Sequence, residues 1–500
     1  MTKTQLAVVG GGPGGYTAAF LAADLGLQVT LIEPDIHLGG VCLNRGCIPS
    51  KTLLHVARTL REARELAGFG VRFEKPQIEI ETLRKRLERT IGTLRGGLTT
   101  LAARRNVRVL RALATLIDSS TLSLEPAFEP VSNDDGSIFA TSTSTEPFPT
   151  TLGFDHLILA TGSAIRPAPF TIPANVANAV WDSTAALELR EVPPRLLVVG
   201  AGFVGLELAA AYASLGSRVH VIESQSEILP SADTDLVRHF ERLYTQYSGI
   251  QIERSTEIIS LLVPTDESVD TGAIEAHLRG AAGVVRRETF DRILVATGRE
   301  PVTSGLGLEK TRVVCDRHGF IEADTQRRTA EAAIFAIGDC TSGPMLAHRA
   351  IHEAKIAVAV LSGGRDEVFE PLAIPGVVYA DPELAWAGET ERSAAAIGRT
   401  VETAAFPWAA NGRSHAEGSP VGITKWIFDP KSQRVIGAGI VGCGASELIG
   451  EAVLAIEKGA TVHDLAEAIH PHPTRSETFG GAAEAQLGTA TDLPPTRTNR

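Results

Sequence analysis

Residues 6–33 decide the fold, and they read LAVVGGGPGGYTAAFLAADLGLQVTLIE. The apolar run at 6–9 predicts a buried strand, the glycines predict a tight turn, and the alanine-rich residues predict a helix before a second strand that ends on Glu33. Residues 196–223, LLVVGAGFVGLELAAAYASLGSRVHVIE, repeat this order, and the first glycine and the terminal acid are 23 positions apart in both copies. The sequence therefore predicts an α/β fold with two Rossmann-like dinucleotide-binding domains.

The glycine spacing in each copy matches the G-x-G-x-x-G fingerprint of a dinucleotide site. The first glycine makes the turn, the second lets a diphosphate approach the backbone, and the third lets the helix pack closely on the strand. The helix N-terminus supplies unpaired N–H groups, and the terminal acid accepts hydrogen bonds from a ribose. These residues are Gly10, Gly12, Gly15 and Glu33 in the first copy, and Gly200, Gly202, Gly205 and Glu223 in the second. The alternative is a pair of structural glycine turns that bind nothing.

Glu223 also indicates which nicotinamide dinucleotide would bind. A carboxylate at this position repels the 2′-phosphate of NADP. The residues that follow it, Ser224, Gln225 and Ser226, include no arginine to receive that phosphate. The second copy therefore favours NAD over NADP.

Shorter strands and changes in composition mark the domain boundaries. Apolar runs at 157–162 and 293–298 both end in Ala-Thr-Gly, and a third run, at 334–339, ends in Gly-Asp. Beyond about residue 370 no dinucleotide motif recurs, and alternation at 422–428 followed by a helical pattern near 446–459 indicates a separate α+β domain. We therefore expect domains at 1–163, 164–297, 298–368 and 369–488, with a hairpin excursion at 117–152 and a disordered tail at 489–500.

The most specific segment is Gly39–Lys51, GGVCLNRGCIPSK, which places Cys42 and Cys47 five residues apart. On an ideal helix such a pair has Cα atoms about 8–9 Å apart. A disulfide requires less than about 7 Å, so pairing needs a local distortion that Gly46 and Pro49 permit. A disulfide in a reducing compartment is usually catalytic or redox-sensing. The alternative is two buried thiols that never pair.

A second polar segment lies near the end of the chain, at His470–Glu477, HPHPTRSE. The prolines predict a non-helical, rigid loop that aims both imidazoles. A histidine oriented by a carboxylate can exchange protons with a thiol near neutral pH. The alternative is a surface loop with incidental histidines. A metal site is not predicted, because His-x-His offers only two ligands.

Composition excludes several classes of protein. The 500 residues include 47 basic and 59 acidic side chains, a net charge of −12, which has the wrong sign for a nucleic-acid binder with a basic face. No apolar run reaches the roughly 18–20 residues that span a bilayer. The first strand begins too close to Met1 for a signal peptide, and five cysteines are too few for a secreted disulfide framework, so we expect a cytoplasmic protein. The remaining cysteines, Cys315, Cys340 and Cys443, are interpreted as small apolar residues.

Taken together, these segments resemble the class I pyridine nucleotide–disulfide oxidoreductases, and within them the bacterial branch that oxidises dihydrolipoamide. The resemblance extends from Gln5 to about Leu487. Its marks, in chain order, are Gly39–Lys51, Trp181–Thr184, Gly338–Asp339, Pro344–His348, Phe406–Ala410 and His470–Glu477.

The resemblance implies FAD in the first dinucleotide domain, NAD in the second, and a C-terminal dimerisation domain. It implies that Cys42 and Cys47 form the redox disulfide, with Cys42 exchanging with substrate and Cys47 nearest the flavin. It also implies that His472 is the acid/base and Glu477 its orienting carboxylate, both reaching the disulfide from the other subunit of a homodimer. The further residues expected at FAD are Lys51, Ala114, Gly162, Asp339 and Ala347, and Gly298 is expected at NAD.

The implied reaction is oxidation of protein-bound dihydrolipoamide to lipoamide with NAD⁺ as acceptor. Its carriers would be the lipoyl-bearing domains of 2-oxoacid dehydrogenase complexes or the glycine cleavage carrier protein, with no nucleic acid and no membrane as partner. The alternatives are a sister NAD(P)H-dependent reductase of another disulfide, a flavoprotein without disulfide chemistry, and a structural subunit. Three places depart from the family pattern: Arg45 replaces a small apolar residue, Ala114 replaces a frequent glycine, and Pro301-Val302 replaces the usual Pro-Asn.

Overall fold

The computed structural model describes residues 2–127, 148–264 and 272–494. It divides into two compact units. The first unit contains Met1–Pro49, Arg84–Pro167 and Gly298–Glu370, and the second contains Ser50–Leu83, Ala168–Thr297 and Pro371–Arg500. The segment Gly298–Glu370 thus belongs to the same compact unit as the first glycine fingerprint.

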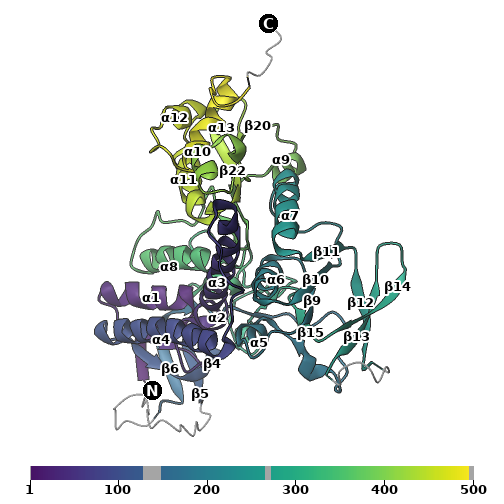
Figure 1. The fold of residues 1–500 in the computed structure, drawn as a ribbon. Helices are drawn as coiled ribbons and strands as arrows, with labels where there is room; N and C mark the ends of the chain where they lie inside the picture. The colour runs from purple at the N-terminus through teal and green to yellow at the C-terminus, as the bar shows by residue number, and fades with distance from the viewer. Residues whose placement is uncertain (1, 128–147, 265–271, 495–500) are drawn as a thin grey trace. The chain divides into compact units, whose positions relative to one another are not determined.

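A seven-stranded sheet forms the centre of the first unit, with strand order β3-β2-β1-β6-β5-β4 and β17 paired to β6. Its strands are β1 (Thr2–Val9), β2 (Val29–Ile32), β3 (Arg108–Leu110), β4 (Ala112–Asp118), β5 (Thr121–Pro126), β6 (Thr151–Leu159) and β17 (Ile334–Ala336). The helices α1 (Pro13–Asp24) and α8 (Ala347–Leu361) lie side by side in Figure 1 and pack in one core with Leu31 and Phe335. The predicted strand–turn–helix–strand unit is therefore β1–α1–β2.

The predicted excursion at 117–152 differs from the structure at both of its ends. Asp118 still belongs to β4, and β5 pairs with β4 and with the start of β6, so these residues extend the main sheet. Their alternating apolar side chains, including Leu116 and Leu122, are fully buried or nearly so, which explains why they remain in the sheet. The middle of the predicted excursion, 128–147, lies outside the described residues.

The second unit contains the repeat of the first β–α–β motif. Its parallel sheet has the order β11-β10-β9-β15-β8. These strands are β8 (Val180–Trp181), β9 (Arg195–Val199), β10 (Arg218–Glu223), β11 (Gln251–Arg254) and β15 (Arg292–Val295), and α6 (Phe203–Leu215) connects β9 to β10. A three-stranded antiparallel layer packs against this sheet through a shared apolar core: β12 (Glu257–Leu262), β13 (Ile274–Arg279) and β14 (Val285–Phe290).

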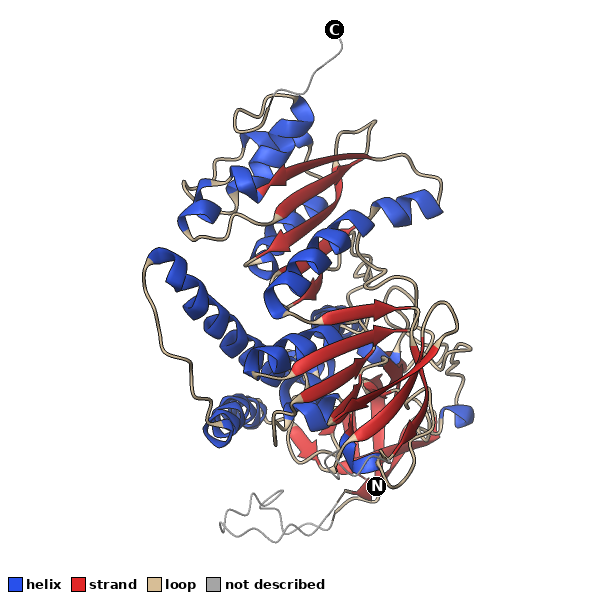
Figure 2. Cartoon of the chain, turned by 45° about the vertical axis from the view of Figure 1, so that its right-hand side comes forward, coloured by secondary structure: helices blue, strands red, loops and turns tan. Residues whose placement is uncertain are grey.

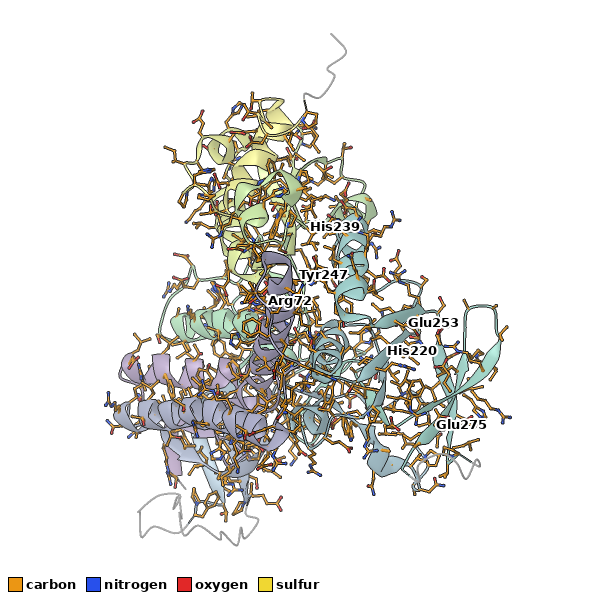
Figure 3. The ribbon with its side chains drawn as sticks, in the orientation of Figure 1. Arg72, His220, His239, Tyr247, Glu253 and Glu275 are labelled. Carbon is orange, nitrogen blue, oxygen red and sulfur yellow. A yellow bond between two sulfur atoms is a disulfide. The ribbon has the colours of Figure 1, made fainter. Side chains whose placement is uncertain are left out.

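A polar cluster around His220 also joins these two layers. The imidazole Nδ1 lies 3.3 Å from a carboxylate oxygen of Glu288 on β14, and Nε2 lies 3.3 Å from one of Glu253 on β11. Figure 3 labels His220 and Glu253. Arg286 Nη1 donates to Glu253 at 2.9 Å, which balances part of the negative charge. The cluster thus ties β10 and β11 of the parallel sheet to the antiparallel layer.

The C-terminal part of the second unit is an antiparallel sheet with helices against one face (Figure 2). The strand order is β18-β19-β22-β21-β20, with β18 (Gly376–Val378), β19 (Glu383–Gly388), β20 (Glu402–Pro407), β21 (Ile423–Phe428) and β22 (Val435–Gly442). The covering helices are α11 (Ala445–Lys458), α12 (Val462–Glu467) and α13 (Glu477–Leu487). The strand predicted at 422–428 and the helix predicted at 446–459 are confirmed.

The tail predicted at 489–500 is only partly described. Thr489 N–H donates to Glu484 O, and Leu493 packs against the C-terminal core, so this part of the predicted tail contacts the C-terminal domain. Residues 495–500 lie outside the described residues. In the described part of the chain, no helix has both the length and the apolar character needed to cross a membrane.

Candidate active site

Cys42 and Cys47 form a disulfide, with their Cα atoms 4.7 Å apart. The predicted distortion is a break between two helices, α2 (Gly40–Arg45) and α3 (Cys47–Glu65). Gly46 occupies the break, and a Cβ atom there would lie 3.0 Å from the Val41 carbonyl oxygen. A larger residue would press on that carbonyl, so the glycine lets the chain turn tightly enough for the two sulfurs to meet.

The first glycine fingerprint forms a tight turn that leaves one side open. Gly10 has φ +106°, and a Cβ there would lie 2.2 Å from the Ala160 carbonyl oxygen. A Cβ on Gly15 would lie 1.7 Å from the Gly10 carbonyl oxygen, so both positions exclude any side chain. A Cβ on Gly12 has no neighbour nearer than 3.9 Å. The backbone at Gly12 is therefore accessible where α1 begins, which fits the diphosphate of a dinucleotide.

Glu33 closes this turn from the end of β2. Its carboxylate accepts hydrogen bonds from the Gly11 N–H at 2.5 Å and from the Asp35 N–H at 2.9 Å. Burial raises the pKa of Glu33, and the two N–H groups oppose that rise. The acid that we predicted as a ribose ligand therefore also holds the glycine turn in shape.

The second fingerprint has the same geometry. Gly200 has φ +106°, and a Cβ on Gly205 would lie 2.0 Å from the Gly200 carbonyl oxygen. A Cβ on Gly202 would have no atom within 4 Å, so this cradle is open as well. Glu223 accepts from the Ala201 N–H and the Gln225 N–H, both at 2.9 Å. Both cradles therefore fit the dinucleotides that the sequence predicts.

Asp339 lies in a hydrogen-bonded chain that sequence reasoning missed. The Ser163 hydroxyl donates to Asp339 Oδ2 at 2.6 Å, and Arg299 Nε donates to the Ser163 hydroxyl oxygen at 2.7 Å. Ser163 begins β7 (Ser163–Ile165), which pairs with β16 (Arg299–Pro301). Gly162 and Gly298 directly precede these strands and have φ +75° and +113°. The chain thus brings both Ala-Thr-Gly turns to one short strand pair beside Asp339.

Ala347 begins α8, and the loop before it is held by a buried ion cluster. Glu353 is fully buried and accepts from Arg327 Nη1 at 2.7 Å, from Arg349 Nε at 3.0 Å and from the Gly338 N–H at 2.6 Å. Arg349 also donates to the Ser342 and Pro344 carbonyl oxygens. The cluster therefore shapes the loop that presents Asp339 and Ala347. The sequence signal for this cluster was Glu353, the only acidic residue in the mostly apolar helix α8.

We expect Glu353→Ala to destabilise the first unit by about 3–5 kcal/mol, because it leaves two buried guanidinium groups without their carboxylate. The midpoint of chemical denaturation, followed by circular dichroism, measures this change. Asp24→Ala is the control, since Asp24 is exposed to solvent and pairs with the half-buried Arg105, and it should cost at most about 1 kcal/mol. A loss of the same size in both variants would contradict the role given to Glu353.

Lys51 lies one turn after Cys47 on α3, and its partner is Glu207 on α6. The ammonium donates to the two Glu207 oxygens at 2.8 and 3.1 Å and lies 4.3 Å from the centre of the Tyr379 ring. Glu207 is buried and also accepts from the Tyr379 N–H at 3.2 Å. Glu207 was not predicted, although it is the only charged residue in α6 and therefore needs a cationic partner.

His472 and Glu477 form the predicted pair. His472 Nδ1 lies 2.7 Å from Glu477 Oε1, and the Thr474 N–H donates to Glu477 Oε2 at 2.6 Å. Burial raises the pKa of Glu477, but the bonds from Thr474 and His472 outweigh it, so the pKa lies below its ordinary value. The imidazole is 80% exposed, so its Nε2 is accessible to a substrate.

His470 has a different partner, Glu451 on α11, whose carboxylate lies 2.7 Å from His470 Nε2. This hydrogen bond raises the pKa of His470, and burial only partly opposes it. A raised folded-state pKa adds stability below the ordinary value of about 6.5, and that stability is lost as the pH rises through the folded-state value. The melting temperature should therefore decrease from pH 6 to pH 8 through loss of this pair. We expect this decrease to be on the order of 1 °C larger in the natural protein than in His470→Gln. Identical pH profiles would contradict this pairing.

Other predicted residues have simpler surroundings. Ala114 is buried in β4, where its backbone pairs with Leu124 of β5. Cys340 is buried, whereas Cys315 and Cys443 are half-buried, and none of the three is in a disulfide. Within the described residues, the carboxylate group spaced for a metal ion is Asp233, Asp235 and Glu391. The Lys425 ammonium lies 2.9 Å from Asp235 and pairs with the other two, so a protein cation already occupies this group.

A family model described as pyridine nucleotide-disulphide oxidoreductase matches residues 4–354. The chain belongs to the pyridine nucleotide–disulfide oxidoreductases. The dimerisation domain of the same family matches residues 374–483 of this oxidoreductase, which supports a homodimer. These matches confirm the predicted family and fold class, and FAD and NAD are the cofactors of this family.

Curated relatives match over nearly the whole chain. The dihydrolipoyl dehydrogenase of Vibrio cholerae is 42% identical over 98% of this chain and 97% of the relative. That of Geobacillus stearothermophilus is 36% identical over 97% of each. Among solved structures, LpdA from Mycobacterium tuberculosis has a TM-score of 0.82 and 27% identity, covering 97% of this chain and all of that one. The chain is thus similar to bacterial dihydrolipoyl dehydrogenases.

Proposed function

We propose that this oxidoreductase oxidises protein-bound dihydrolipoamide to lipoamide, with NAD⁺ as the final electron acceptor. The observation that carries the proposal is the Cys42–Cys47 disulfide at the break between α2 and α3. A vicinal dithiol substrate can reduce such a disulfide through two exchange steps. The curated dihydrolipoyl dehydrogenases at about 40% identity over nearly all of the chain support this substrate.

The first exchange step requires a base. We propose that His472 of the partner subunit accepts the proton of one substrate thiol at Nε2, while Glu477 holds its Nδ1. The resulting thiolate attacks Cys42 Sγ and forms a mixed disulfide, and the Cys42–Cys47 bond breaks with its electron pair on Cys47. The second substrate thiol then attacks the substrate sulfur of the mixed disulfide and passes its proton to Cys42 Sγ, which leaves as a thiol. Lipoamide leaves as a cyclic disulfide, with Cys47 as a thiolate and the first proton still on the imidazole of His472.

The proposed cofactor sites lie at the two glycine fingerprints, FAD at the first and NAD at the second. The residues that would hold FAD are Gly10, Gly12, Gly15, Glu33, Lys51, Ala114, Gly162, Asp339 and Ala347, and those for NAD are Gly200, Gly202, Gly205, Glu223 and Gly298. The chemistry supplied by bound FAD is two-electron transfer from the reduced cysteine pair to NAD⁺. Lys51 would place a cation beside the flavin ring, with its charge balanced by Glu207. The open backbone at Gly12 and Gly202 supports both sites.

The functional domains would be 1–163 for FAD, 164–297 for NAD, 298–368 to complete the FAD site, and 369–488 for dimerisation. The grouping of 298–370 with the first fingerprint supports the third of these. The partners would be the lipoyl-bearing domains of 2-oxoacid dehydrogenase complexes or of the glycine cleavage system. The enzyme would act in the bacterial cytoplasm, in keeping with its bacterial relatives.

An anaerobic titration of the purified protein with dihydrolipoamide, followed by NAD⁺, tests the proposal. We expect dihydrolipoamide to change the visible absorbance of the flavin, and added NAD⁺ to restore it with formation of NADH. Reduction by NADPH but not by dihydrolipoamide would exclude this function and favour a sister disulfide reductase. Reduction by NADH with no response of the cysteine pair would favour a flavoprotein without disulfide chemistry.

A further inference from the structure

Arg45 lies between the two redox cysteines, yet no step of the thiol exchange uses its charge. It is the last residue of α2, whose first residue, Gly40, packs directly on the FAD fingerprint. A Cβ on Gly40 would lie 2.7 Å from Gly12 Cα. Arg45 is five residues further on, about 7.5 Å along the helix axis. The guanidinium therefore stands on a helix that is anchored at the diphosphate cradle.

The contacts of Arg45 leave donors available for a ligand. Its guanidinium pairs with Asp35, and the two side chains are 42% and 40% exposed. The Asp35 N–H in turn donates to Glu33 at 2.9 Å, so the ion pair is joined to the ribose acid. A guanidinium has five N–H donors in a planar fork, and a side-by-side pair with one carboxylate uses two of them. The remaining donors have the geometry that suits phosphate oxygens.

The charge of Arg45 also influences groups at the FAD cradle, in keeping with its ion pair to Asp35 beside Glu33. Burial lowers the pKa of Arg299, Asp339 opposes this, and Arg45 adds to the lowering. Burial also lowers the pKa of Arg95. The charge of Glu88 opposes this lowering, and the charge of Arg45 again adds to it. Arg45 therefore acts both on Glu33, at the ribose end, and on Arg299, which is linked through Ser163 to Asp339 at the ribityl end.

The covalent structure of FAD then identifies the ligand group. Its ribose and its ribityl chain are joined by the diphosphate, which is the anionic part of the molecule. Arg45 is paired beside the ribose acid and stands on a helix whose first residue packs on Gly12, so its cation lies on the side of the cradle where that diphosphate would bind. We propose that Arg45 donates hydrogen bonds to the diphosphate of bound FAD while Asp35 holds its guanidinium in place.

The test measures FAD affinity rather than turnover. FAD release from the diluted holoenzyme is followed by flavin fluorescence in the natural protein, Arg45→Val, Arg45→Gln and Arg45→Lys, with ADP and riboflavin as competitors. We expect Arg45→Val and Arg45→Gln to weaken FAD and ADP by about 10- to 100-fold, because each loses charge-assisted hydrogen bonds. Arg45→Lys, which keeps the charge, should lose less than about tenfold. Riboflavin, which carries no phosphate, should be unaffected.

Arg105→Val is the matched control, since Arg105 also pairs with one exposed aspartate of the same unit, Asp24. It should leave FAD affinity unchanged. FAD affinity within about twofold of the natural protein in both Arg45→Val and Arg45→Gln would overturn the proposal, as would equal losses for riboflavin and ADP. The Arg45 variants should also show a weaker dependence of FAD affinity on KCl concentration. Because no dithiol is present, these results are independent of the proposed substrate.

Discussion

Replacing Cys42 with serine is expected to lower dihydrolipoamide turnover by about four orders of magnitude or more. Removal of the catalytic nucleophile from other enzymes has effects of this size. A serine hydroxyl forms no mixed disulfide, so the substrate thiolate has no sulfur to attack at this position. Replacing Cys47 should have an equal effect for a different reason. Cys42 would then be a free thiol, and no disulfide would be present to accept the electron pair.

The measurement is steady-state formation of NADH from dihydrolipoamide and NAD⁺. Cys315→Ser is the matched control, because Cys315 is half-buried and is not in a disulfide. It should retain full turnover. All three variants should still oxidise NADH with an artificial electron acceptor, since that reaction needs the two cofactor sites but not the disulfide. Substantial dihydrolipoamide turnover by Cys42→Ser would remove the disulfide from the proposed reaction.

The redox segment illustrates what the sequence predicts well. The spacing of Cys42 and Cys47 is too long for a disulfide on a regular helix, and the sequence contains Gly46 where a break is needed. The structure has that break, with α2 ending at Arg45 and α3 beginning at Cys47. The repeated glycine units were predictable for the same reason. The first and third glycines of each unit are required because any side chain there would clash with the backbone, as at Gly10 and Gly15.

The residues that sequence reasoning missed are those that act through partners distant in the chain. Glu207 pairs with Lys51 across 156 residues, and Ser163 bonds Asp339 across 176. No local spacing predicts such a pair, because the fold and not the sequence interval sets the distance. Glu353 and Glu207 nevertheless carry a signal, since each is an acid in a mostly apolar helix. Burial of a carboxylate requires a cation, and only the structure identifies which one.

Replacing His472 with glutamine is expected to lower turnover by about two to four orders of magnitude near neutral pH, the usual contribution of a general base. The hydrogen bond from Nδ1 to Glu477 leaves Nε2 with the lone pair that accepts a proton. Glutamine keeps a similar size and a hydrogen-bonding end but accepts no proton from a thiol. His470→Gln is the matched control, because His470 is bonded to Glu451, and it should retain turnover.

The pH dependence separates a lost base from a distorted loop. Without His472, the reaction depends on substrate that has already ionised in water. For a thiol with a pKa near 8.5, the ionised fraction rises about tenfold for each unit by which the pH increases, as long as the pH stays below the pKa. Turnover by His472→Gln should therefore rise steeply between pH 6 and pH 8, whereas the natural protein should show a much weaker rise. A distorted loop would lower turnover by the same factor at every pH. A flat profile, or a loss of only severalfold at pH 7, would exclude His472 as the base.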